Sequence, residues 1–177
     1  MIVVVSHDPD WITQFESEAR RIKQVVGDAV LRIHHIVSTA IPGMKAKPII
    51  DLLLEVGSLE ALDRKVPIIE SLGYEAMGEF GIPGRRYFRL DDAAGRRTHQ
   101  VHSFAAGAPD VLRHVAFRDY MRAHPLAAAE YGSLKERLAK AYPHDRNAYN
   151  QGKDAFVKER ERRALVWAGS AGAAPAA

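Results

Sequence analysis

The sequence of 177 residues contains no cysteine. Disulfide bonds and thiolate metal sites are therefore excluded, and the absence of disulfides favours a cytoplasmic location. No window approaches 18 uninterrupted apolar residues, and the N-terminal segment MIVVVSHDPDW has no basic region followed by a long apolar run. We therefore expect a soluble protein without a membrane span or a signal peptide.

The charge is only mildly unbalanced. The formal net charge is +3 and the isoelectric point is about 9.2, without an arginine-rich block or an aromatic-basic RNA motif. This balance favours a small anionic substrate, such as a nucleotide, over a nucleic acid. The apolar content of 47% is enough for one good core in a chain of this length.

Apolar spacing and turn residues predict an α/β (α+β) fold with a small mixed sheet flanked by helices. The predicted helices cover residues 11–26, 58–72, 110–123, 126–141 and 145–167. The predicted strands cover residues 30–36, 48–56, 74–80, 85–90 and 97–104. We expect one domain at 1–167, with a sheet core at 1–108 and a helical cap at 109–167. Residues 168–177 have no burial pattern and are predicted to be a disordered tail.

The segment 34–55, HHIVSTAIPGMKAKPIIDLLLE, has the order of parts that a phosphate-binding site needs. Hydroxyl side chains at Ser38 and Thr39 precede a Pro-Gly turn, and Lys47 precedes an apolar strand that begins with Asp51. Hydroxyl groups and backbone amides can hold an anion, a lysine can neutralise it, and a carboxylate can hold a divalent cation against it. We therefore predict the functional site at this segment.

Several motifs in order resemble those of one family. These are HHIVSTAIPGMKAKPIIDLLLEV, GRRYFRL, THQVHSF, FRDYMRAHP and the closing DRNAY with KDAF. Together they resemble the GrpB family, a branch of the polymerase-beta-like nucleotidyltransferase superfamily, over residues 1–165. The resemblance implies a nucleotidyltransferase-like enzyme that transfers a nucleotidyl or related group to a small acceptor, with Mg²⁺ or Mn²⁺ as cofactor. In that superfamily a Gly-Ser turn precedes an Asp-x-Asp or Asp-x-Glu pair on the next strand, and a third carboxylate follows on a later strand.

This sequence departs from that pattern at two positions. Val37 stands where the Gly-Ser turn has glycine, and a β-branched residue resists positive φ. Leu53 stands where the second acid is expected, and Glu55 lies roughly 13 Å from Asp51 along a strand at about 3.3 Å per residue. We therefore predict a single metal site rather than a two-metal clamp.

The second metal ligand is expected on a neighbouring strand, in the segment THQVH. Gln100 and His102 point to one face of that strand and His99 to the other. We predict Asp51 and His102 as metal ligands and catalytic residues. Arg86 and Lys153 are expected to orient the acceptor, while Ser38, Thr39 and Lys47 bind phosphate.

Each candidate also has a structural explanation. Asp51 could accept hydrogen bonds from loop amides, and Ser38 and Thr39 could cap a turn. The histidines could be satisfied sheet residues, and the arginines could protect a sheet edge from aggregation. Two other functions fit the sequence: a non-catalytic module that binds a nucleotide or another anion, or a different group-transfer or hydrolytic enzyme of a specialised pathway.

Overall fold

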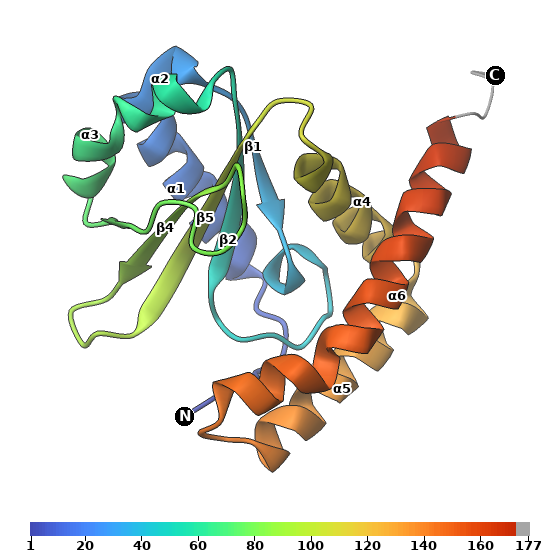
Figure 1. Ribbon diagram of the computed structural model, residues 1–177. Helices are drawn as coiled ribbons and strands as arrows, with labels where there is room; N and C mark the ends of the chain where they lie inside the picture. Colours follow the sequence, from blue (N-terminus) through green and yellow to red (C-terminus); the bar gives the residue numbers. More distant parts are fainter. Residues whose placement is uncertain (173–177) are drawn as a thin grey trace. The chain divides into compact units, whose positions relative to one another are not determined.

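The computed structural model describes residues 1–172 (Figure 1). The chain folds into two compact units. The sheet unit comprises Pro9–Ile36 and Ile49–Val111. The helical unit comprises Met1–Asp8, Val37–Pro48 and the chain from Leu112 onward. The loop 37–48 therefore belongs with the helices, whereas the sequence placed it in the sheet core.

The sheet unit contains a five-stranded mixed sheet in the order β1-β2-β5-β4-β3. The central strands β2 and β5 run parallel, and the other neighbouring pairs are antiparallel. The strands are β1 (Val30–Ile36), β2 (Ile50–Val56), β3 (Glu75–Ala76), β4 (Arg86–Asp91) and β5 (Arg97–Ala105). Three helices accompany them: α1 (Asp10–Val26), α2 (Leu59–Asp63) and α3 (Val66–Glu70).

Strand β2 is the centre of this core. It lies between β1 and β5, and helix α1 packs against it. Its apolar side chains are all buried: Ile50, Leu52, Leu53, Leu54 and Val56. A strand covered on both faces is expected to read as a nearly continuous apolar run, as this one does. Asp51 interrupts the run near its first residue, so its carboxylate is held on a well-packed strand.

Two predicted elements differ from the observed ones. The predicted helix 58–72 is split into α2 and α3, because Pro67 lies in the first turn of α3 and cannot continue a helix from α2. Ser58 caps α2 as predicted, its Oγ accepting from the Ala61 amide at 3.1 Å. The predicted strand 74–80 is reduced to β3, because Gly78 and Gly81 adopt positive φ and the chain turns there.

The helical unit contains α4 (Pro109–Ala123) from Leu112 onward, α5 (Pro125–Ala141), α6 (Arg146–Gly172) and the short 3-10 turn η2 (Ser38–Ala40) (Figure 1). The apolar side chains of Ile41 and Met44 are buried in one core with those of α4 and α5, including Phe117 and Tyr131. Arg122 Nε also donates to the Ala40 carbonyl at 2.9 Å. The loop 37–48 is thus fixed by helices that follow it by some eighty residues.

Helix α6 extends to Gly172, into the segment predicted as a disordered tail. Alanine is the strongest helix former, and Ala164 and Ala168 carry the helix past Trp167. The remaining part of the predicted tail, 173–177, lies outside the described residues. Within the described part of the chain, no helix is both long and apolar enough to cross a membrane.

Candidate functional site

A buried lysine lies against the predicted phosphate loop. Lys135 on α5 is 3% exposed, and its ammonium group donates to Ser38 Oγ at 2.6 Å. The same ammonium lies 4.5 Å from the centroid of the Tyr131 ring. Within residues 1–172 no carboxylate forms an ion pair with Lys135. A buried ammonium without a carboxylate is costly, so this arrangement requires an explanation other than stability.

Two further lysines are close to a second buried aromatic residue. Lys47 Nζ lies 5.4 Å from the centroid of the Tyr149 ring, and Lys153 Nζ lies 5.3 Å from it. Tyr149 is 1% exposed, and its hydroxyl has no hydrogen-bond partner among the described residues. Burial raises the pKa of Tyr149 to about 12, so the hydroxyl keeps its proton and remains a donor. We call Lys47, Lys135 and Lys153 the lysine cluster.

The three charges act on one another. Burial is the main cause that lowers the pKa of Lys135 to about 7, and the positive charges of Lys153 and Lys47 contribute to the same shift. At neutral pH the Lys135 side chain therefore exchanges readily between its charged and neutral forms. An anion beside the cluster would oppose the lysine repulsion and favour the charged form, which is the electrostatic property of an anion-binding site.

Lys135 was not among the residues predicted from sequence, although its helix was. The buried positions of α5 include Ala127, Ala128, Tyr131, Lys135 and Ala139, which recur at helical spacing. A lysine on the apolar face of a predicted helix, four residues after Tyr131, is the signal that could have found it. Because lysine side chains are usually exposed to solvent, a lysine on the apolar face of a helix is easily taken for a surface residue.

The sheet unit holds a separate polar pair, Asp51 and His102. Asp51 on β2 is opposite Gln100 in the parallel register, and Leu53 is opposite His102. Asp51 and His102 are therefore diagonal neighbours on one face, and His102 Nε2 lies 3.3 Å from Asp51 Oδ1. Their side chains are 14% and 13% exposed, respectively. With this geometry the Asp51 carboxylate can orient the His102 imidazole. Alternatively, the two side chains can act as two ligands of one metal cation.

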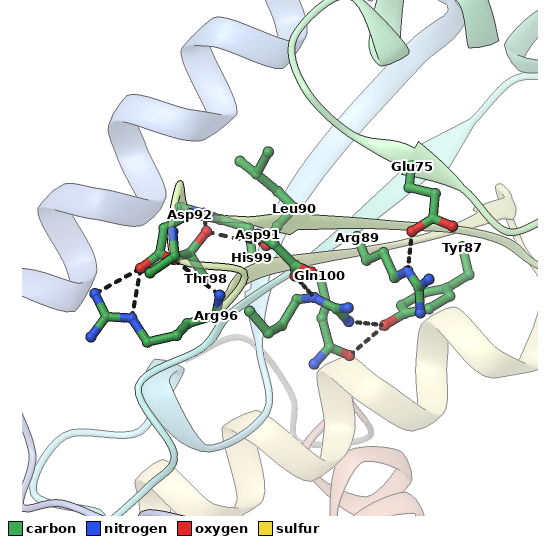
Figure 2. Close-up of polar contacts among 12 residues, drawn as sticks. Glu75, Tyr87, Arg89, Leu90, Asp91, Asp92, Arg96, Thr98, His99 and Gln100 are labelled. Atoms are coloured by element: carbon green, nitrogen blue, oxygen red, sulfur yellow. Dashed lines mark hydrogen bonds and ion pairs between the residues drawn. The ribbon is translucent and has the colours of Figure 1, made fainter.

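Aromatic and cationic side chains surround His102. The Tyr87 ring centroid is 5.3 Å from that of His102, and the Tyr87 hydroxyl donates to Gln100 Oε1 at 3.0 Å (Figure 2). Burial raises the pKa of Tyr87. Arg85 is buried, with Nη1 at 3.5 Å from His102 Nδ1 and its carbon Cζ 5.0 Å from the Tyr87 ring centroid. Asp51 and His102 thus lie in a polar environment that is largely shielded from solvent.

Arg86 is not brought to this pair. It faces Ser103 in the register, one residue out of phase with Tyr87 and His102, and so points to the other face of the sheet. Its Nε and Nη2 donate to the two carboxylate oxygens of Asp63 at 2.6 and 2.8 Å. The structure places Arg85 beside His102, whereas the sequence predicted Arg86 as the arginine that orients the acceptor.

The other candidate partners of Asp51 are also engaged elsewhere. Glu55 Oε1 lies 2.5 Å from His34 Nε2, across strands β1 and β2. His99 lies on the opposite face from His102, where burial lowers its pKa and the charges of Glu18 and Arg21 act on it. Of the partners considered for Asp51, the structure brings His102 to its carboxylate.

Few side chains in the sheet unit are placed to ligate a metal ion beside Asp51. In the part of the chain that the structure describes, no three His, Asp or Glu side chains converge as metal ligands do. Leu53 is fully buried at the position of the second acid. The donor set therefore does not fit a two-metal clamp. Asp51 and His102 could fill two positions around a single cation, leaving the others to substrate and water.

Val37 adopts a conformation that favours glycine. Its φ of 61° and ψ of −156° lie in a region that is almost restricted to glycine. Replacing Val37 with glycine is expected to raise the free energy of unfolding by up to about 1 kcal/mol. Relief of about 1–3 kcal/mol of strain exceeds the chain-entropy cost of about 0.4–1 kcal/mol together with the lost packing of a half-buried side chain that lines a cavity. Urea unfolding measures the change.

Val37→Ala is the matched control. Alanine keeps the Cβ atom and therefore the strain, while it loses part of the side-chain packing. The Val37→Ala protein should unfold at or below the wild-type urea concentration. Equal midpoints for the glycine and alanine variants would show that no strain is stored at this position.

The five-stranded mixed sheet flanked by helices is a nucleotidyltransferase-like fold. A distant example of that fold is terminal uridylyl transferase 4 from Trypanosoma brucei with bound dUTP, with a TM-score of 0.52 and 12% identity. The likeness covers 83% of this chain and 52% of that one, and it concerns the fold alone.

The sequence comparisons identify the family to which the chain belongs. The model of the GrpB protein family matches residues 1–163, and the chain belongs to the GrpB family. The crystal structure of the conserved protein GrpB from Enterococcus faecalis is 44% identical, with a TM-score of 0.88 over 92% of this chain and 97% of that one. YqkA from Bacillus subtilis is 45% identical over 94% of this chain. The chain spans about half of YqkA, 48% of its length.

Proposed function

We propose that the chain is a nucleotidyltransferase-like enzyme that transfers a nucleotidyl or related phosphate-containing group to a small acceptor. The observation that carries the proposal is the buried ammonium of Lys135 on Ser38, in the loop where the superfamily holds phosphate. The GrpB family membership and the nucleotidyltransferase-like fold support it.

The lysine cluster supplies the phosphate-binding part of this proposal. Lys135 and the Ser38 hydroxyl are within hydrogen-bond distance of each other, so both can contact one phosphate oxygen or two adjacent ones. Lys47 and Lys153 add charge beside Tyr149, whose buried hydroxyl can donate to the same anion. Thr39, buried next to Ser38, stays a candidate for the same role. Such preorganised donors stabilise the charge that develops during phosphoryl or nucleotidyl transfer.

The Asp51–His102 pair supplies the proton-handling part. With Asp51 Oδ1 near Nε2, the carboxylate can stabilise an imidazolium and fix its orientation. His102 would then take the proton of an acceptor hydroxyl or amine at Nδ1, the ring nitrogen that does not face Asp51. Arg85 replaces Arg86 as the cation beside this pair. If Mg²⁺ or Mn²⁺ takes part, Asp51 and His102 are the side chains that would hold it.

A non-catalytic binding module is the second candidate. The observation that favours it is the buried Leu53 at the position of the second acid, together with a donor set that does not fit two metals. In this case the lysine cluster would still bind an anion, but Asp51 would have no catalytic role.

Replacing Asp51 with asparagine separates the two candidates. We expect nucleoside triphosphate turnover, measured as pyrophosphate release with Mg²⁺ or Mn²⁺ and a panel of small acceptors, to fall at least about 100-fold. Asparagine keeps the shape but not the charge that supports His102. Binding of the same nucleotide without metal should change little, because the lysine cluster is intact.

Glu55→Gln is the matched control for this experiment. Glu55 is on the same strand and contacts a histidine in the same manner, but that histidine is His34. Turnover in Glu55→Gln should stay within a few-fold of wild type. Nucleotide binding without turnover, unchanged in Asp51→Asn, would instead establish the binding module.

A further inference from the structure

A cavity of about 350 Å³ lies within the helical unit, and Lys153 is the one lining residue to which the proposed function gives a role. Lys153 and Tyr131 line it, and Lys135 Nζ lies 4.5 Å from the Tyr131 ring centroid. The cavity therefore shares side chains with the surroundings of the lysine cluster. Its volume is at the lower end of small-molecule sites, about 300–1,000 Å³.

The lining combines apolar and hydrogen-bonding groups. Val37, Phe117 and Val157 contribute apolar surface, and Asn150 contributes an amide that can both donate and accept. An apolar lining with a few polar groups is typical of a site for an organic molecule rather than for a bare anion. Inorganic phosphate alone would leave this surface unused.

The two carboxylates that line the cavity are each paired with a basic side chain. Arg113 Nη1 and Glu161 Oε1 form an ion pair at 2.7 Å. Asp154 Oδ2 pairs with Lys158 Nζ at 2.6 Å. Lys153 carries its charge toward Tyr149 of the lysine cluster. The cavity thus favours a neutral organic group, with negative charge confined to the end nearest the lysines.

We propose that the cavity binds the neutral organic part of a phosphorylated small molecule while the lysine cluster binds its phosphates. The ligand class is an organic phosphate whose organic part is a single hydrogen-bonding group of nucleoside size or smaller. This inference rests on the proposed function, because it takes the lysine cluster as the phosphate site. It gives Val37 a role: its side chain lines the cavity where a glycine would leave more space.

The ring of Tyr131 is already in contact with other groups. It stacks with Phe156 at a centroid distance of 5.2 Å and an interplanar angle of 10°, and the Lys135 ammonium lies over it. Selectivity within this ligand class is therefore expected from shape and from hydrogen bonds to groups such as Asn150, rather than from stacking on Tyr131.

The test compares ligands that carry the same number of phosphates. Calorimetric titration of the full chain should show at least tenfold tighter binding in one of two pairs: a nucleoside diphosphate (ADP, GDP, CDP or UDP) against pyrophosphate, or glucose 1-phosphate against inorganic phosphate. Val157→Phe, which fills the cavity, should remove most of that advantage and leave pyrophosphate affinity within about twofold. Val157→Ala, which enlarges the cavity, should keep the advantage.

A second variant avoids the core in case Val157→Phe does not fold. Asn150 is exposed, and Asn150→Leu should weaken the organic phosphate several-fold without weakening pyrophosphate. Equal wild-type affinities within both pairs, or equal losses for both members in the variants, would overturn the inference while pyrophosphate binding still supports the proposed function. If no phosphate compound binds the wild-type chain, the phosphate site and this inference both fail.

Discussion

Replacing Lys135 with methionine is expected to abolish phosphate binding and to stabilise the fold. Methionine fills nearly the same volume without a charge, so it removes the desolvation cost of a buried ammonium that no described carboxylate neutralises. We expect the free energy of unfolding to rise by about 1–4 kcal/mol. Pyrophosphate affinity should fall at least about 100-fold, because the most buried donor of the cluster is lost.

The sign of the stability effect follows from the pKa of Lys135. Burial lowers that pKa from 10.5 to about 7 in the folded chain. Below pH 7 the lysine is charged in both states, and the folded state carries the full cost of burying the charge. Between pH 7 and 10.5 the unfolded chain binds the extra proton, so wild-type stability rises with pH. The gain in Lys135→Met should therefore be largest below pH 7 and should shrink toward pH 10.

Lys140→Met is the matched control for this variant. Lys140 is on the same helix, but its side chain is 78% exposed and lies 3.7 Å from Glu136. Its replacement should change stability by less than about 0.5 kcal/mol and leave pyrophosphate binding intact. Destabilisation of Lys135→Met by urea unfolding at pH 6 would mean that Lys135 serves the packing of the helices, not an anion.

Phosphate affinity is expected to fall as pH rises through about 7. The bound anion favours charged Lys135, whereas the free protein loses that proton near pH 7. Binding above pH 7 must therefore take up a proton, and affinity should drop by up to about tenfold per pH unit between 7.5 and 9. ADP is a suitable probe, because its terminal phosphate has lost its last proton above about pH 7. Calorimetric titration across this range measures the slope.

Arginine at position 135 tests whether the slope belongs to this lysine. Its guanidinium stays protonated throughout the range, so Lys135→Arg should flatten the pH profile wherever it still binds ADP. An unchanged slope in Lys135→Arg, or a flat profile in the wild type, would assign the pH dependence to another group.

Local pattern predicted most of the sheet. Strand β1 was predicted at its observed bounds of 30–36, and the parallel strand β2 was recognised from its apolar run with Asp51 near its beginning. Side-chain alternation also separated His102 and Gln100 from His99, as observed. These features depend on a period of two residues and on burial, which a single sequence records.

The orientation of Arg86 could not be predicted from side-chain alternation alone. Strands β4 and β5 were predicted to within one residue at each end. The arginine that points toward His102, however, depends on the register between these two strands. A shift of one residue exchanges the faces of Arg85 and Arg86, and the sequence pattern does not specify the register that closely.

The features that could not be predicted depend on contacts between residues far apart in the sequence. Ser38 and Lys135 are 97 residues apart, and Ala40 and Arg122 are 82 apart. No local periodicity joins the loop 37–48 to α4 and α5, so its place in the helical unit could not be predicted. For the same reason the sequence did not reveal Lys135, which donates to Ser38 in the segment predicted to bind phosphate.

The central claim is that the lysine cluster binds phosphate through Lys135, and nitrogen-15 NMR of the lysine side chains tests it most directly. The Lys135 Nζ resonance, assigned by its loss in Lys135→Met, should titrate near pH 7 in the free chain. With saturating pyrophosphate its pKa should rise by at least about one unit, which corresponds to 1.4 kcal/mol of preferential binding to the charged form. A pKa that pyrophosphate does not move would contradict the claim.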